Sequence, residues 1–124
     1  MLVLDSGALV AIDKRDRQVG AMLEVARHQG VRVSTSAAVV AQVWRPGAMQ
    51  ANLARALQGV RAVPRDVTTA KRLGVLLGAS GRSDVVDAHV AQLATDGGQV
   101  LTSDPEDIRH LLKVLGVRAA VTAV

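Results

Sequence analysis

The first seven residues, Met1–Gly7, constrain the fold more than any other stretch of the chain. Four apolar residues, Met1 to Leu4, are followed directly by Asp5 and then by two small residues. An apolar run without alternation is typical of a central parallel strand that is buried on both faces. The carboxyl end of such a strand lies at the edge where open α/β sheets bind ligands. We therefore expect Asp5 at a ligand-binding edge, with a helix N-cap as its alternative role.

The rest of the chain alternates between strand-like and helix-like segments. Apolar or β-branched runs predict strands at residues 2–5, 31–34, 60–63, 99–102 and 117–121. Helical periodicity, caps and stop signals predict helices at residues 7–13, 17–29, 37–45, 48–58, 66–78, 84–95 and 105–115. Strands that alternate with helices indicate a parallel sheet. We expect one α/β domain, residues 1–124, built as a three-layer α/β/α sandwich around a parallel sheet of four or five strands.

The composition narrows the class of protein. The chain has 124 residues, of which 49% are hydrophobic, enough for one domain with a sizeable core. It contains no cysteine, so disulfides, thiolate metal sites and a cysteine nucleophile are excluded. No apolar run reaches the roughly 18 residues that span a bilayer, and Asp5 interrupts the stretch that a signal peptide would need. We therefore expect a soluble, cytoplasmic protein that does not contact a membrane.

The chain is basic, with a formal net charge of +4. This charge favours an anionic partner, and nucleic acid first. The codon usage of a GC-rich genome is an alternative source of the many arginines. The absence of Phe and Tyr argues against the base-stacking platforms of common single-strand binders.

Carboxylates recur where the predicted strands end and the predicted helices begin. Besides Asp5, Asp104 follows the strand at 99–102, and Asp84 and Asp87 open the helix at 84–95 with an i, i+3 spacing. In a parallel sheet these positions share one edge. Clustered carboxylates repel one another, and a hard cation such as Mg²⁺ or Mn²⁺ keeps them ionised together. Such ions activate water and stabilise phosphodiester displacement.

Helix capping is the competing explanation for these acids. The segments Asp84–Asp87 and Asp104–Asp107 both resemble capping boxes, with Pro105 at the first helical position. Acidic residues at helix N-termini are also favoured by the helix dipole alone. The joint pattern, with Asp5 at the end of a buried strand, favours a metal site.

Other site types find less support. The chain has no phosphate-loop lysine motif and no glycine-rich dinucleotide fingerprint. A phosphatase or another Mg²⁺-dependent phosphotransferase would need an acid nucleophile, and no second acid follows Asp5 at the expected distance. The three histidines share no ligand-like spacing, and we expect His89 on a helix surface near the site.

Four stretches, in this order and spacing, resemble the PIN-domain ribonucleases of the VapC-type bacterial toxin class. They are Leu4–Ser6, Ser36–Arg45, Ser83–Ala91 and Leu101–Asp107. The resemblance covers nearly the whole chain and implies a PIN-like α/β sandwich. It further implies an Mg²⁺-dependent (or Mn²⁺-dependent) endoribonuclease that acts as the toxin of a type II toxin–antitoxin pair. The partners that it implies are an RNA substrate, a small antitoxin protein and a second copy of the chain in a homodimer.

The resemblance also assigns residues. The acids that it implies as catalytic and metal-binding are Asp5, Asp87 and Asp104, with Asp84 and Asp107 as further metal ligands. Ser6, Gln42 and Ser103 would support the site. We expect basic residues to position the RNA backbone, each with a plain surface residue as its alternative: Arg15, Arg17, Arg45 and Arg82.

Gln42 departs from the family pattern. The family has a glutamate on this helix, whereas a glutamine amide carries no charge and cannot act as a base. This favours an alternative function, a catalytically weakened binding module for an antitoxin or for RNA. In that case the apolar helices at 37–45 and 48–58, which include Trp44, would form a groove for a partner helix. Burial of Trp44 in the core is the competing interpretation.

Overall fold

The computed structural model describes residues 1–45 and 50–124, and within them the chain forms five strands and seven helices. The strands are β1 (Leu2–Leu4), β2 (Val33–Ser36), β3 (Arg61–Val63), β4 (Gln99–Thr102) and β5 (Ala120–Ala123). The helices are α1 (Ser6–Asp13), α2 (Arg17–His28), α3 (Ala37–Val43), α4 (Ala51–Leu57), α5 (Val67–Ser80), α6 (Val85–Leu93) and α7 (Pro105–Leu115). Across the described ranges, every helix is too short or too polar to cross a bilayer.

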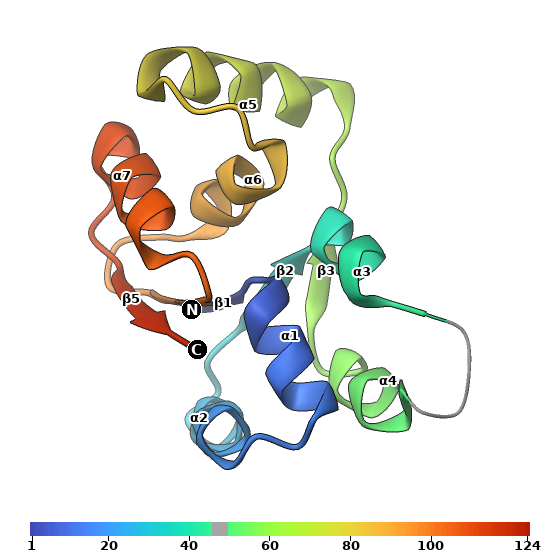
Figure 1. Ribbon diagram of the computed structural model, residues 1–124. Helices are drawn as coiled ribbons and strands as arrows, with labels where there is room; N and C mark the ends of the chain where they lie inside the picture. The colour runs from blue at the N-terminus through green and yellow to red at the C-terminus, as the bar shows by residue number, and fades with distance from the viewer. Residues whose placement is uncertain (46–49) are drawn as a thin grey trace.

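All five strands are parallel and pair in the order β3-β2-β1-β4-β5 (Figure 1). β1 is the central strand, and Val3 lies between Ser34 of β2 and Val100 of β4. The chain leaves β1 toward β2 and β3, and later returns to the other side of β1 for β4 and β5. The strand order therefore reverses between β1 and β4, the place where open α/β sheets bind ligands.

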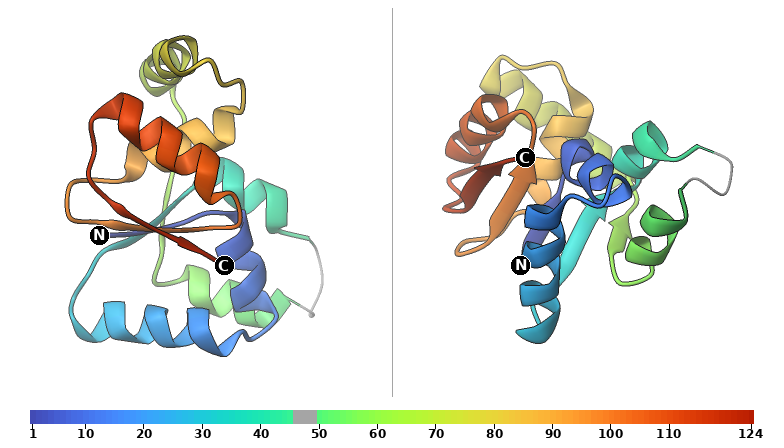
Figure 2. Two further views of the ribbon diagram at one scale, coloured as in Figure 1. Left: turned by 60° about the vertical axis from the view of Figure 1, so that its left-hand side comes forward. Right: turned by 60° about the horizontal axis from the view of Figure 1, so that its bottom comes forward.

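The sheet is the middle layer of a three-layer sandwich. Helices α5, α6 and α7 cover one face, and α1, α2 and α4 cover the other (Figure 2). The side chains of Val3 and Leu4 are fully buried between these layers, as are Val100 and Leu101 of the neighbouring strand. This burial on both faces explains why β1 reads as an unbroken apolar run. The predicted fold class, a three-layer α/β/α sandwich around a parallel sheet of four or five strands, is confirmed, and the sheet has five strands.

The turn after β1 brings the start of α1 against the turn after β4. Gly7 allows this approach, because a Cβ at this position would lie 2.8 Å from both Cβ and Oγ of Ser103. The backbone N–H of Asp5 donates to the carbonyl of Leu101, which holds the two strand ends together. Asp5 and Asp104 therefore emerge on adjacent strand ends.

Strand β2 starts and ends two residues later than predicted, at Val33–Ser36 in place of 31–34. The buried hydroxyls explain the difference. Thr35 donates its hydroxyl to the carbonyl of Leu4 at 2.6 Å, and Ser36 caps α3 by accepting from the N–H of Ala38. Polar side chains can thus occupy a central strand because their hydrogen bonds are satisfied.

Other predicted bounds were wrong by a few residues. Helix α5 continues through Gly78 to Ser80 and ends at Gly81, which has the left-handed backbone conformation (φ 69°) that favours glycine. Strand β5 lies at Ala120–Ala123 and not at 117–121. Helices α3 and α6 are each shorter at the C-terminus than predicted. The predicted stop at Pro46–Gly47 and the predicted start of the fourth helix at residue 48 fall outside the described residues.

Candidate metal centre

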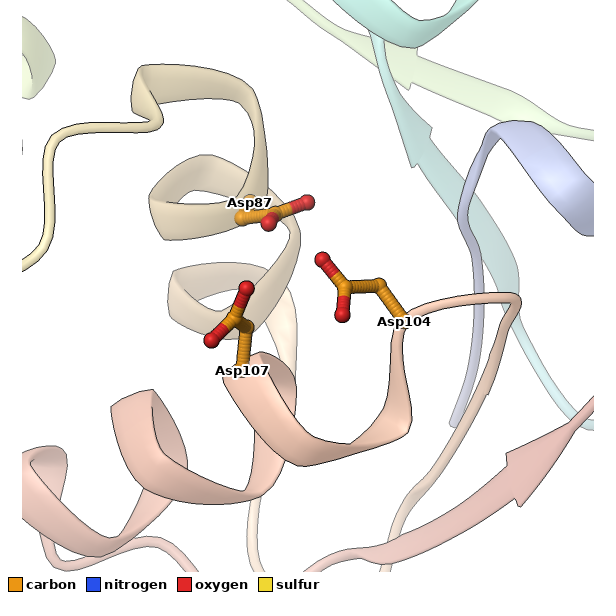
Figure 3. Close-up of side chains that lie close together, drawn as sticks. All are labelled: Asp87, Asp104 and Asp107. Atoms are coloured by element: carbon orange, nitrogen blue, oxygen red, sulfur yellow. The ribbon is translucent and has the colours of Figure 1, made fainter.

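Three carboxylates converge at the carboxyl edge of the sheet. Asp87 comes from the first turn of α6, and Asp104 and Asp107 come from the start of α7 (Figure 3). One ligand oxygen from each of the three lies within 4.8 Å of the other two. The side chains point toward one another from two helices, and all three are partly exposed to solvent. Spatial proximity across α6 and α7 therefore assembles the cluster.

The capping interpretation holds for Asp5, which is the N-cap of α1, and for Asp84, and it fails for Asp104. Asp84 is the N-cap of α6, because its carboxylate accepts from the N–H of Asp87 at 3.0 Å. Asp104 occupies the N-cap position of α7 but makes no side-chain capping bond. The Asp104 carboxylate is therefore directed into the cluster.

Asp5 lies behind the cluster and is only 3% exposed. Its carboxylate accepts from the Thr102 hydroxyl at 2.6 Å and from the N–H of Ser6 at 2.7 Å. The same Thr102 oxygen accepts from the N–H of Asp104 at 2.9 Å. One buried hydroxyl thus connects the acid after β1 to the acid after β4 and fixes their relative positions.

The crowding of these acids shifts the pKa values of two of them. Burial, followed by the charges of Asp84 and Asp5 and the proximity of Asp104, raises the pKa of Asp87 to about 7. Burial and the neighbouring Asp107 raise the pKa of Asp104 above its ordinary value. Like charges held together in a half-buried site resist ionisation. A cation placed among them would reverse this effect.

The donor set fits a hard divalent cation. Carboxylate oxygens are the ligands of Mg²⁺, Mn²⁺ and Ca²⁺, with metal–oxygen distances of about 2.0–2.6 Å. Two oxygens on the same ion are then separated by no more than about 5 Å, and the cluster meets that limit at 4.8 Å. Asp87, Asp104 and Asp107 can therefore hold a metal ion, with Asp5 adding negative charge from behind.

An arginine also reaches the cluster. The Nε of Arg82 lies 3.2 Å from Oδ1 of Asp107, and about two-fifths of each side chain is exposed. An ion pair this exposed contributes little to stability. Arg82 therefore places a positive charge at the rim of the carboxylates.

Arg15 and Arg17 instead lie beyond the C-terminal end of α1, roughly 12 Å along the helix axis from Asp5.

The three residues that were predicted to support the site lie in two different places. Ser6 and Gln42 line the same cavity, between α1 and α3. Ser103 is exposed and packs against Gly7. Among the described residues, the three-carboxylate group around Asp104 includes neither Asp5 nor Asp84, both of which were predicted as metal ligands.

Sequence reasoning missed Thr102 and misjudged His89. His89 is fully buried, and its Nδ1 lies 2.6 Å from the Ser36 hydroxyl, which joins α6 to the end of β2. Burial and the charge of Arg65 lower the pKa of His89. The expected surface position was wrong because α6 is packed on several sides. The apolar neighbours Ala88, Val90 and Ala91 were the available signal.

Trp44 is 43% exposed, so the interpretation that buries it in the core is wrong. It follows α3 as the C-cap residue, and its N–H donates to the carbonyl of Val40. The chain therefore presents its only aromatic side chain of the Phe, Trp and Tyr class to solvent.

Comparison with known proteins adds no relative: no family model matches the chain, and no curated protein matches it.

Proposed function

We propose that this protein is a divalent-metal-dependent endoribonuclease with a PIN-like fold, acting as the toxin of a toxin–antitoxin pair. The observation that carries the proposal is the convergence of Asp87, Asp104 and Asp107 at the strand-order reversal, with Asp5 linked to Asp104 through the Thr102 hydroxyl. An acidic cluster at this edge suits a phosphodiester substrate once a metal ion neutralises it. The positive net charge of the chain supports the same class of substrate.

Each residue has a defined task in this proposal. Asp87, Asp104 and Asp107 hold the metal ion, for which Mg²⁺ is the best candidate, and Asp5 adds charge that favours its binding. A divalent cation bound here supplies activation of water and neutralisation of charge at the scissile phosphate. Thr102 fixes the position of Asp5 relative to Asp104 through its two hydrogen bonds. Arg82, beside Asp107, is positioned to contact an RNA phosphate.

The partners that we propose are those implied by the resemblance to PIN-domain toxins. RNA is the substrate, a small antitoxin protein is the inhibitor, and a second copy of the chain completes a homodimer. Arg82 lies beside Asp107, and Arg45 lines the cavity that includes Ser6, so we propose that both contact the RNA backbone, whereas Arg15 and Arg17 would contact RNA that extends along α1.

A binding module is the second candidate, and two observations favour it. Gln42 lines a cavity beside Ser6 without contributing a negative charge. Trp44 and Val10 are exposed on neighbouring helices, which suits a protein or RNA partner. In this case the fold binds its partner and cleaves nothing.

A cleavage assay separates the two candidates. The purified protein is incubated with a mixed-sequence RNA in millimolar Mg²⁺. We expect cleavage that EDTA abolishes and that Asp104→Asn lowers at least about a hundredfold. Asp104→Asn is the sharpest variant because this side chain caps no helix. Glu24→Gln, which changes the charge equally on the exposed face of α2, should cleave like the parent. Cleavage that survives both EDTA and Asp104→Asn would contradict the proposal.

Gln42→Glu tests whether the neutral residue limits activity. An added carboxylate on the cavity wall that also includes Ser6, the residue after Asp5, adds negative charge on that side of the proposed metal site and should tighten metal binding. Cleavage should then rise at limiting Mg²⁺ and rise less at saturating Mg²⁺. A parent that cleaves nothing, beside a Gln42→Glu variant that does, would support the binding module.

A further inference from the structure

A second polar site lies beside the acidic cluster. A cavity of about 580 Å³ opens between α1, α3 and α4, and its wall includes Ser6, Asp13, Gln42 and Arg45. This volume is within the range of pockets that hold small organic groups. Ser6 directly follows Asp5, which the Thr102 hydroxyl links to the backbone of Asp104, so the cavity begins on the Asp5 side of the proposed metal centre. From Ser6 it extends along α1 to Asp13, a rise of about 10 Å, comparable with the length of one nucleotide.

Asp13 is a poor residue for stability at its position. Its Oδ1 atom is buried and has no hydrogen-bond partner among the described residues. A buried acceptor without a donor costs free energy of folding. Asp13 is also the last residue of α1, where the partial negative charge of the helix terminus disfavours a carboxylate. Two independent penalties at one side chain indicate a role in binding.

Some of the other polar side chains on the cavity wall are held by hydrogen bonds within the protein, and others are exposed to a ligand. Gln50 is structural, because it accepts from the N–H of Arg45 and donates to the carbonyl of Val43 at 2.9 Å. Arg45 donates to the carbonyl of Trp44 at 2.6 Å and stays exposed. Gln42 is exposed on the last turn of α3. The cavity therefore combines a carboxylate acceptor with amide and guanidinium donors.

We propose that this cavity binds a guanine base of the RNA, an inference that rests on the proposed function. A carboxylate is matched by two adjacent N–H donors, which guanine presents at N1 and at its 2-amino group. Adenine and cytosine offer an amino group beside a ring acceptor, and uracil offers one N–H between two carbonyls. Rotation about the broad χ2 torsion of Asp13 turns both oxygens toward such an edge. Gln42 or Arg45 can donate to guanine O6. Unpaired bases in RNA are commonly read in this way.

Binding without cleavage tests the proposal directly. A dye-labelled hexauridine RNA with one central guanosine, inosine or adenosine is titrated with the protein in EDTA, and anisotropy is recorded. Inosine lacks only the 2-amino group of guanosine. We expect guanosine to bind about tenfold more tightly than adenosine, with inosine between them. Asp13→Asn should lose the preference for guanosine, because an amide matches the amino group and ring acceptor of adenine better than the two donors of guanine, whereas Glu24→Gln should keep the preference. The ratio between RNAs is used because removing a negative charge strengthens all RNA binding.

The outcomes separate this inference from the proposed function. Equal binding of the three RNAs by the parent, or no binding, overturns the guanine site, and the inosine comparison needs no variant to fold. A guanosine preference that persists in Asp13→Asn also overturns it. Mg²⁺-dependent cleavage without base preference contradicts the guanine site alone. Guanosine-selective binding by a protein that never cleaves contradicts the nuclease alone.

Discussion

Asp87 is a half-buried carboxyl among like charges, and this predicts an unusual pH dependence of stability. Its pKa is raised to about 7 in the folded protein, whereas in the unfolded chain it is about 4. Between these values the folded state binds more protons than the unfolded state. The free energy of unfolding should therefore fall as pH rises from about 4 to 7, and this contribution should stay lost above pH 7.

Asp87→Asn removes this titration and provides the measurement. Without metal, the Tm of the variant relative to the parent should rise between pH 5 and pH 8. Because the site is partly solvated, we expect a change on the order of 1 kcal/mol, or about 4 °C. A Tm difference that stays constant across this range would show that Asp87 ionises normally.

Thr102 predicts a second effect at the residue scale. Thr102→Val keeps the shape of the side chain but leaves the Asp5 carboxylate and the Asp104 N–H without their shared partner. Loss of these bonds should cost about 1–3 kcal/mol of stability and weaken Mg²⁺ binding. The control is Thr95→Val, an exposed hydroxyl whose removal should change stability by less than about 0.5 kcal/mol. Equal unfolding curves for the two variants would contradict the role of Thr102.

The sequence located the acids better than their supports. Asp5, Asp87, Asp104 and Asp107 were predictable because strand ends and helix starts share one edge in a parallel sheet. The hydroxyl of Thr102 was not predictable, since its role depends on the register between β1 and β4. Which three acids form the tightest group also depends on how α6 meets α7, which no local pattern encodes.

At the scale of elements, the turn after β1 depends on a close contact. Gly7→Ala would place a Cβ 2.8 Å from Ser103 and push α1 away from the turn that carries Asp104. We expect a loss of about 1–3 kcal/mol and weaker metal binding. Gly20→Ala, at the fourth position of α2, meets no atom within 4 Å and should stabilise the helix by up to about 1 kcal/mol. Thermal unfolding of both variants should give shifts of opposite sign, and two shifts of the same sign would contradict this account.

The bounds of the elements show where local patterns stop being informative. The order and type of the elements followed from alternating strand and helix signals. The position of β2 did not, because Thr35 and Ser36 form strand only when Leu4, Ala38 and His89 supply hydrogen-bond partners. Helix α5 passes through Gly78 and ends at Gly81, because Gly81 and not Gly78 has the left-handed conformation of a helix C-cap.

For the whole molecule, the central claim is that the fold assembles a divalent metal site from distant parts of the chain. The five-stranded parallel sheet was predictable from its apolar and β-branched runs. It brings the end of β1 beside the end of β4, 97 residues apart for the Asp5–Thr102 pair. The proposed metal site is therefore a product of the topology, and unfolding should abolish metal binding.

Isothermal titration calorimetry with Mg²⁺ tests this claim most directly. The folded parent should bind Mg²⁺ at a saturable site, with affinity increasing as pH rises toward 7, because Asp87 must lose its proton. Asp104→Asn should weaken binding about tenfold or more, and Glu24→Gln should bind like the parent. Saturable binding by the parent that Asp104→Asn leaves unchanged, or no saturable binding at all, would contradict the account.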